Sequence, residues 1–172
     1  MKKLIIQTSP YHTASTFLIN ALYGLIPELT DKKIIRIKDN EWEEYFDEIM
    51  VVKCHNINID ELIEKYKNNY ELYFICSERI EKGYIIDEKY KSYNNVIIFQ
   101  FEELNESSTN NLYNIISNIY YKINTILNIK LNIESGIGRI IKMNNRYEEI
   151  KHNSFNYIDD FFEIHGSHRN RP

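Results

Sequence analysis

The sequence predicts an α/β protein, a three-layer sandwich in which helices cover both faces of a mainly parallel sheet of roughly five strands. Two observations lead to this fold class. Short segments that are apolar almost throughout alternate along the chain with longer segments whose apolar residues recur at helical spacing. Strands of that kind bury both of their faces, which is typical of parallel sheets covered by helices.

Length and composition fit one domain of an ordinary globular protein. The chain has 172 residues, of which 43% are hydrophobic and 27% charged. Its net charge of -4 argues against a general nucleic-acid binder. No apolar run approaches the roughly 18–20 residues of a membrane span, and the amino-terminal run is too short for a signal peptide. We therefore expect a cytoplasmic protein in which Cys54 and Cys76 are reduced and buried.

The first half of the chain predicts strands and helices in alternation. Residues 3–8 form an apolar run typical of a strand. A helix is expected over residues 15–25, where apolar side chains recur at helical spacing, and Pro27 should end it. The other elements expected here are strands over 33–38 and 49–55, and helices over 41–48 and 59–69.

The second half continues the alternation. Apolar runs predict strands over 70–77 and 95–101. A long helix is expected over 109–127, and a last helix over 139–151. In parallel α/β sheets, ligands bind beyond the carboxyl ends of the strands. The segments that follow the strands should therefore converge on one crevice: residues 9–16, His55, 77–79 and 101–103.

Residues 9–16 match the spacing of a phosphate-binding loop, which gives the predicted fold a P-loop nucleotide hydrolase-like character. Ala14 takes the place of the last glycine, Ser15 that of the lysine, and Thr16 that of the metal-binding hydroxyl. Backbone amides and the following helix terminus would attract an anion. The missing lysine argues against nucleotide hydrolysis. A proline turn followed by an ordinary Ser/Thr helix cap is the alternative.

The stretch "TSPYHTASTFL" (residues 8–18) resembles the phosphosulfate loop of sulfotransferases, in which a strand ends in Tyr-Pro-Lys-Ser-Gly-Thr-Thr-Trp. His12 falls on the family's Lys, with one residue inserted after Pro10. The resemblance implies that the loop holds 3′-phosphoadenosine 5′-phosphosulfate, and that His12 assists catalysis. The residues it places around this co-substrate are Tyr11, His12, Thr13, Ala14, Ser15 and Thr16.

The stretch "VVKCH" (residues 51–55) resembles the family's apolar strand followed by Lys-Thr-His. Lys53 matches the Lys, and His55 matches the base that removes a proton from the acceptor. A histidine at the end of a strand suits that chemistry. The alternative is a histidine that hydrogen-bonds a loop carbonyl.

Three further segments complete the resemblance. Arg79, in "YFICSERIEKG", matches the residue that binds the donor's 3′-phosphate, a task that suits the guanidinium fork. The alternative for Arg79 is an ion pair with Glu78 or Glu81. "FEEL" (residues 101–104) resembles Tyr-Glu-Asp-Leu and is interpreted as architectural.

The basic tail, residues 160–172, ends in "HGSHRNRP" and could close on the 3′-phosphate. A disordered terminus is the alternative. The spacing of His165 and His168 leaves a metal site as a further alternative, but they lack obvious carboxylate or Cys partners, and no metal is expected. The tail residues proposed to bind the co-substrate are Gly166, Ser167, Arg169 and Arg171.

The predicted function is sulfonyl transfer to a hydroxyl or amine of a small molecule or carbohydrate, with no nucleic acid or membrane partner. The chain is shorter than typical sulfotransferases, so its acceptor loops are reduced or supplied by a second copy of the chain. Two alternatives remain open. One is a P-loop kinase or NTPase-like phosphoryl transferase, with Glu78 holding a metal. The other is a non-catalytic nucleotide-binding relative.

Overall fold

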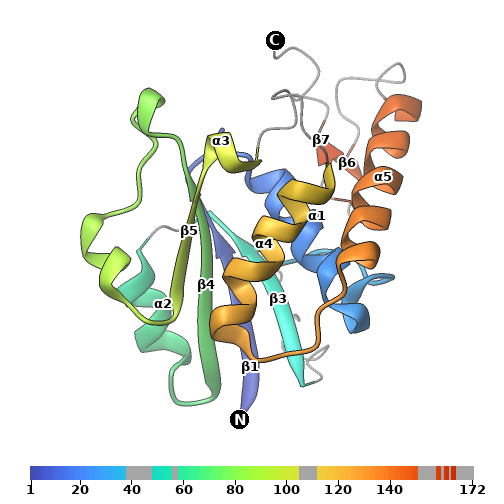
Figure 1. The fold of residues 1–172 in the computed structure, drawn as a ribbon. Coiled ribbons are helices and arrows are strands. Elements are labelled where there is room, and N and C mark those ends of the chain that lie inside the picture. The colour runs from blue at the N-terminus through green and yellow to red at the C-terminus, as the bar shows by residue number, and fades with distance from the viewer. Residues whose placement is uncertain are drawn as a thin grey trace.

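The computed structural model describes residues 1–37, 48–55, 58–104, 112–150, 158–159, 161–162 and 164–165. Five strands form one sheet in the order β2-β3-β1-β4-β5, and every neighbouring pair is parallel. Helices lie on both faces of this sheet (Figure 1). The predicted three-layer α/β fold is confirmed, and β1 (Lys2–Thr8) lies at its centre.

The central strands match their predicted ranges closely. Strands β3 (Ile49–Cys54) and β4 (Tyr70–Glu78) flank β1 and run parallel to it. The segments that follow these three strands therefore lie at the same edge of the sheet, as predicted. The outer strands are β5 (Val96–Gln100) and β2 (Ile35–Arg36). The prediction was wrong about the length of β2, because this edge strand pairs with β3 over two residues only. Residues 41–47 of the expected acidic helix lie outside the described part of the chain.

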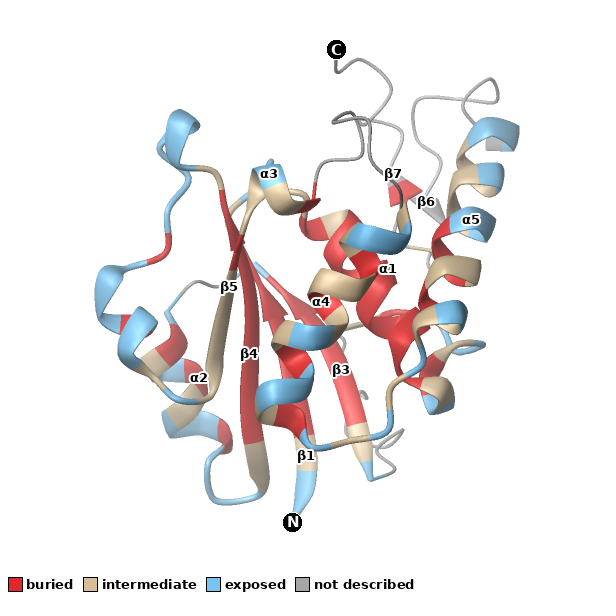
Figure 2. Cartoon of the chain, in the orientation of Figure 1, coloured by how far each residue is buried: buried red, intermediate tan, exposed pale blue. Residues whose placement is uncertain are grey.

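Helices α1 (Ser15–Leu25), α4 (Leu112–Leu127) and α5 (Ile133–Ile150) cover one face of the sheet. The bounds of α1 are those predicted from its apolar spacing. Figure 2 shows this helix buried along most of its length. Gly24 explains the close approach of α1 and α5, because a Cβ added there would lie 2.8 Å from Cα of Gly136.

Helix α5 begins six residues before the predicted start at Arg139. The glycines at 136 and 138 are typical of a loop, yet Gly136 is where α5 meets α1. The true start carries a cap, since the Asn132 side-chain oxygen accepts a hydrogen bond from the Ser135 amide at 3.0 Å. Gly136, inside α5, is therefore required by helix packing.

The opposite face is covered by α2 (Ile59–Tyr66) and the short 3-10 helix η4 (Glu88–Ser92). Cys54 and Cys76 are buried in this second core, as expected. Burial raises the pKa of the Cys76 thiol to about 12.

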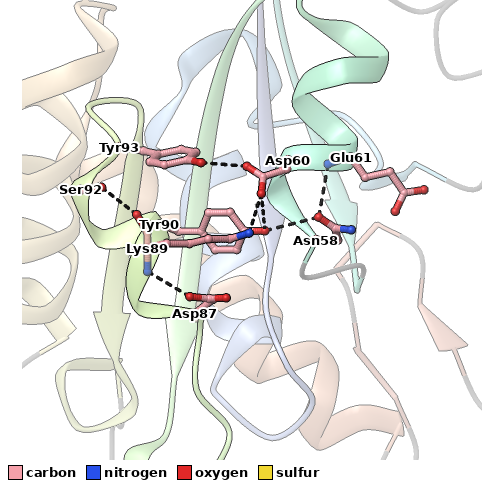
Figure 3. Close-up of polar contacts among 8 residues, drawn as sticks. All are labelled: Asn58, Asp60, Glu61, Asp87, Lys89, Tyr90, Ser92 and Tyr93. Atoms are coloured by element: carbon pink, nitrogen blue, oxygen red, sulfur yellow. Dashed lines mark hydrogen bonds and ion pairs between the residues drawn. The ribbon is translucent and has the colours of Figure 1, made fainter.

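A polar latch joins α2 to η4 around Asp60 (Figure 3). The Asp60 carboxylate accepts hydrogen bonds from Lys89 Nζ at 2.6 Å and Tyr93 Oη at 2.8 Å. The hydrogen bond from Lys89 is the main cause that lowers the pKa of Asp60. The second face is thus held by exposed charge as well as by apolar packing.

The remaining described elements are short. They are η1 (Pro27–Leu29), η3 (Ile80–Lys82), α3 (Phe101–Leu104) and the antiparallel pair β6 (Ile158–Asp159) and β7 (Ile164–His165). Arg139 is buried and donates hydrogen bonds to the carbonyls of Thr30 and Phe161, which tie this carboxyl-terminal segment to α5. Within the described ranges, no helix is long and apolar enough to cross a membrane.

Candidate functional site

The loop that leaves β1 contains two non-glycine residues in the left-handed region. His12 has φ 68° and Ala14 has φ 62°, while the φ of Thr13 between them is not positive. A left-handed conformation costs a non-glycine residue roughly 1–2 kcal/mol. Alternating backbone handedness of this kind directs successive amides toward one point, which is the geometry of an anion-binding concavity.

A buried hydroxyl cluster (Ser9, Thr13 and Ser77) anchors this loop to β4. Ser77 Oγ lies 3.0 Å from Ser9 Oγ and 2.9 Å from Thr13 Oγ1. The Ser77 amide also donates to Ser9 Oγ at 2.9 Å, and Thr13 Oγ1 donates to the Pro10 carbonyl at 2.9 Å. All three side chains are fully buried. Hydrogen bonds within the cluster therefore hold the strained backbone in place.

Helix α1 begins at the end of the loop without a capping side chain. The N-cap residue is Ala14, and no acidic residue lies in the first turn. Ser15 and Thr16 are therefore the first helical residues, and the alternative of an ordinary Ser/Thr cap does not hold. The first amides of a helix have no acceptor within the helix and form its positive end. The open end of α1 suits an anion.

His55 follows β3 and reaches the base of the same loop. Its Nδ1 lies 3.2 Å from the Ser9 carbonyl oxygen. Its ring stacks on Tyr11, with centroids 4.4 Å apart and planes 21° apart. Because a carbonyl only accepts, the neutral ring carries its proton on Nδ1 and its lone pair on Nε2. The alternative of a loop-carbonyl contact is thus present, and that contact fixes the tautomer that a general base needs.

Lys53 lies inside the sheet, not at its rim. It pairs in register with Gln7 of β1 and Arg36 of β2, on the face that α1 covers. Lys53 is buried and Arg36 is half-buried. The sequence analysis did not place Arg36 beside Lys53, because the local sequence does not indicate that β2 pairs with β3. This register places two cationic side chains side by side in the half of the sheet next to the loop.

Arg79 follows β4 and lies on the ring of Phe101, with Cζ 4.0 Å from the ring centroid. Its Nε donates to Glu81 Oε1 at 2.7 Å, so the ion pair considered for this residue is formed with Glu81. The turn that follows contains Gly83 at φ 71° and closes by pairing Tyr84 with Arg79. Phe101 of "FEEL" thus has a contact role beyond its architectural one.

The turn after Arg79 projects from the molecule as an exposed arm (Figure 2). Ile80, Tyr84 and Ile85 are exposed on this arm, and Tyr11 is exposed on the neighbouring loop. The ring centroids of His12 and Tyr84 lie 5.7 Å apart, which links the arm to the loop. The rim of the site is therefore aromatic and apolar, whereas its base is made of hydroxyls.

Glu78, the proposed metal-holding acid of the phosphoryl-transferase alternative, is fully buried. Its carboxylate accepts hydrogen bonds from the Ile86 amide at 3.1 Å and Gln100 Nε2 at 2.7 Å, and Lys91 Nζ lies 3.5 Å away. These contacts give Glu78 the structural task of joining β4, β5 and the segment between them.

The structure brings together the loop, His55 and, through β4, Arg79. The residues in direct contact around the loop include Ser9 and Ser77, which the sequence analysis placed in the converging segments without assigning either a role. The only indication of a role for these two serines was their position at the ends of strands. Hydroxyl residues are common at such positions, so the position alone does not indicate a site. The predicted residues of the tail lie outside the described part of the chain: Gly166, Ser167, Arg169 and Arg171.

No family model matches the chain, and comparisons with curated proteins and with solved structures give no match either. The motifs and the geometry of the site are therefore the basis for a functional proposal.

Proposed function

We propose that this chain is a sulfotransferase that moves a sulfonyl group from 3′-phosphoadenosine 5′-phosphosulfate to a hydroxyl or amine, with His55 as general base. One observation carries the proposal. The imidazole of His55 is held on the Ser9 carbonyl and on the Tyr11 ring, both belonging to the loop that precedes the open end of α1. A base and an anion-binding loop therefore share one edge of the sheet.

The loop suits the sulfonated end of the donor. Its alternating backbone and the uncapped α1 offer amides to a phosphate and an adjoining sulfonate. The position of the P-loop lysine holds Ser15, so charge would be neutralised by amides, hydroxyls and the exposed His12. Such a loop matches a sulfonate beside one phosphate better than a magnesium-bound triphosphate.

In the proposed step, the acceptor oxygen or nitrogen attacks the sulfur while its proton passes to Nε2 of His55. The bond from sulfur to the phosphate oxygen breaks, and adenosine 3′,5′-bisphosphate leaves with that electron pair. The Nδ1 contact to Ser9 keeps the imidazole in place as it becomes charged, because both ring nitrogens are then donors.

Arg79 is proposed to bind the 3′-phosphate. Its guanidinium is supported by Phe101 and already holds a carboxylate oxygen of Glu81. A phosphate offers more acceptor oxygens in the geometry of the guanidinium fork, and would replace Glu81 as its partner. The phosphoryl-transferase alternative has less support, because the contacts of Glu78 use its carboxylate within the fold.

Calorimetry with adenosine 3′,5′-bisphosphate and with magnesium ATP tests the proposal. We expect the bisphosphate to bind at least tenfold more tightly, as one charge-assisted pair at the 3′-phosphate allows. The variant Arg79→Ala should remove most of this preference. Arg146→Ala is its matched control, since Arg146 also forms a surface ion pair, with Glu149, on a distant helix.

A clear preference for magnesium ATP in the same titrations would overturn the sulfotransferase proposal. So would bisphosphate binding that Arg79→Ala and Arg146→Ala leave equally intact, because the resemblance at Arg79 would then have no counterpart in binding.

A further inference from the structure

We infer that Ser77 is a positioning residue that couples the anion-binding loop to Arg79, and so sets the spacing between the two ends of the donor nucleotide. This inference rests on the proposed function. It goes further by assigning to a buried hydroxyl, to which the resemblance to sulfotransferases gives no role, the task of matching the site to a nucleotide with two separate phosphate groups.

The hydroxyl of Ser77 is the midpoint of the buried hydroxyl cluster. It bridges Ser9, at the start of the loop, and Thr13, which lies between the two left-handed residues His12 and Ala14. The second anchor of Thr13 is the Pro10 carbonyl, which belongs to the same loop. Ser77 therefore supplies the link that fastens the strained part of the loop to a different strand.

Arg79 follows Ser77 on the same continuous backbone. In extended chain two residues span roughly 7 Å, and their side chains share one side. The backbone of Arg79 is fixed as well, since its amide donates to the Tyr84 carbonyl at 2.7 Å and its carbonyl accepts from the Tyr84 amide at 3.1 Å. One short rigid segment thus carries the anchor of the loop at one end and the guanidinium at the other.

This arrangement has a consequence for ligand discrimination. A ligand with one phosphate needs only the loop, whereas a bisphosphate gains from Arg79 only if the loop and Arg79 keep their spacing. Without the Ser77 hydroxyl, Thr13 loses its tie to β4 and the left-handed residues beside it can relax. Binding of a single phosphate would change little, and the added benefit of the second phosphate would be lost.

The test is calorimetry of Ser77→Ala with adenosine 3′,5′-bisphosphate and adenosine 5′-monophosphate. In the unsubstituted chain we expect the bisphosphate to bind about ten- to a hundredfold more tightly, the factor typical of a charge-assisted contact. In Ser77→Ala this ratio should fall to about threefold or less.

Ser135→Ala is the matched control. Ser135 Oγ lies 2.9 Å from Thr30 Oγ1, which makes a partly buried hydroxyl pair at a place remote from the loop. Its loss should leave the ratio unchanged. If Ser77→Ala does not fold, Thr13→Val removes the other partner of the same hydroxyl pair and should lower the ratio in the same way.

Three outcomes decide the matter. A ratio that falls in Ser77→Ala but not in Ser135→Ala supports the inference. A large ratio in the unsubstituted chain that Ser77→Ala and Thr13→Val preserve overturns the inference and leaves the proposed function standing. A chain that shows no preference for the bisphosphate overturns the proposed function, and the inference with it.

Discussion

The two edges of the central sheet use their polar groups differently. At the amino edge, Lys3 Nζ donates to Glu71 Oε2 at 2.8 Å and to Tyr73 Oη at 3.2 Å, and Tyr73 donates in turn to Glu71. This triad satisfies its own charges. At the carboxyl edge, buried hydroxyls hold a strained loop while His12 and His55 remain exposed.

The two edges also differ in backbone strain, which lowers the stability of the fold at the carboxyl edge. Left-handed alanine and histidine are unfavourable, and such strain persists only where surrounding contacts enforce it. The triad at the amino edge carries no comparable backbone strain among the described residues. In the proposed function the ligand binds at the carboxyl edge, where the backbone strain lies, whereas the triad at the amino edge contributes stability.

The largest expected effect is at the carboxyl edge, on turnover. His55→Ala should lower kcat/KM about 10²- to 10⁴-fold, the usual contribution of a general base. Thermal unfolding and binding of adenosine 3′,5′-bisphosphate should change little, because His55 is exposed. Sulfonyl-transfer assays alongside calorimetry would measure both.

Tyr121→Ala, on the exposed side of α4, is a suitable control for His55→Ala and should leave turnover intact. Undiminished turnover in His55→Ala would remove the general base from the proposal. Binding without turnover in the unsubstituted chain would favour a non-catalytic nucleotide-binding protein.

A smaller effect, on stability, is expected from Ala14→Gly, and this substitution to glycine should stabilise the protein. Since Ala14 has φ 62°, glycine should relieve left-handed strain and raise the free energy of unfolding by about 1 kcal/mol. Ala21→Gly, inside α1, should lower it by more than this, because glycine weakens a helix by about 1 kcal/mol and the substitution also removes a buried methyl group. Chemical denaturation of both variants would measure these changes. If the backbone at Ala14 is strained, the free energy of unfolding must rise in Ala14→Gly and fall in Ala21→Gly.

The smallest effect concerns the amino edge and its pH dependence. The hydrogen bond from Lys3 is the main cause that holds the pKa of Glu71 below its ordinary 4.5. The stabilising contribution is therefore present above that value and is lost as the pH falls through the lower pKa of the folded state.

Glu71→Gln should cost about 0.2–1 kcal/mol near pH 7, because the pair is partly exposed. In denaturation measurements this cost should diminish as the pH falls through the lowered pKa of Glu71. Turnover should not change in this variant. A loss of turnover in Glu71→Gln would contradict the separation of the two edges.

Much of the fold could be predicted because helical and strand periodicities are local properties. The bounds of α1 follow from its apolar spacing and Pro27 alone. The start of α5 could not be predicted in that way, since Gly136 acts through a contact with Gly24, more than a hundred residues away. The shortness of β2 likewise depends on its partner strand.

The site shows the same division between local and distant information. The segments after β1, β3 and β4 were expected at one edge, and the topology places them there. The roles of Ser77 and Arg36 depend on which strand tips become neighbours, which no sequence window contains. The ion pair between Arg79 and Glu81 could be considered from the sequence, because the two residues are close along the chain.

The contact between Gly24 and Gly136 has a consequence for how the site can change. Backbone touches backbone there, so α1 cannot slide along α5 without a steric collision. The opposite end of α1 is the end that opens onto the loop. Because α1 cannot shift along its axis, a residue inserted or deleted between Ser9 and Ala14 must be accommodated by the loop alone.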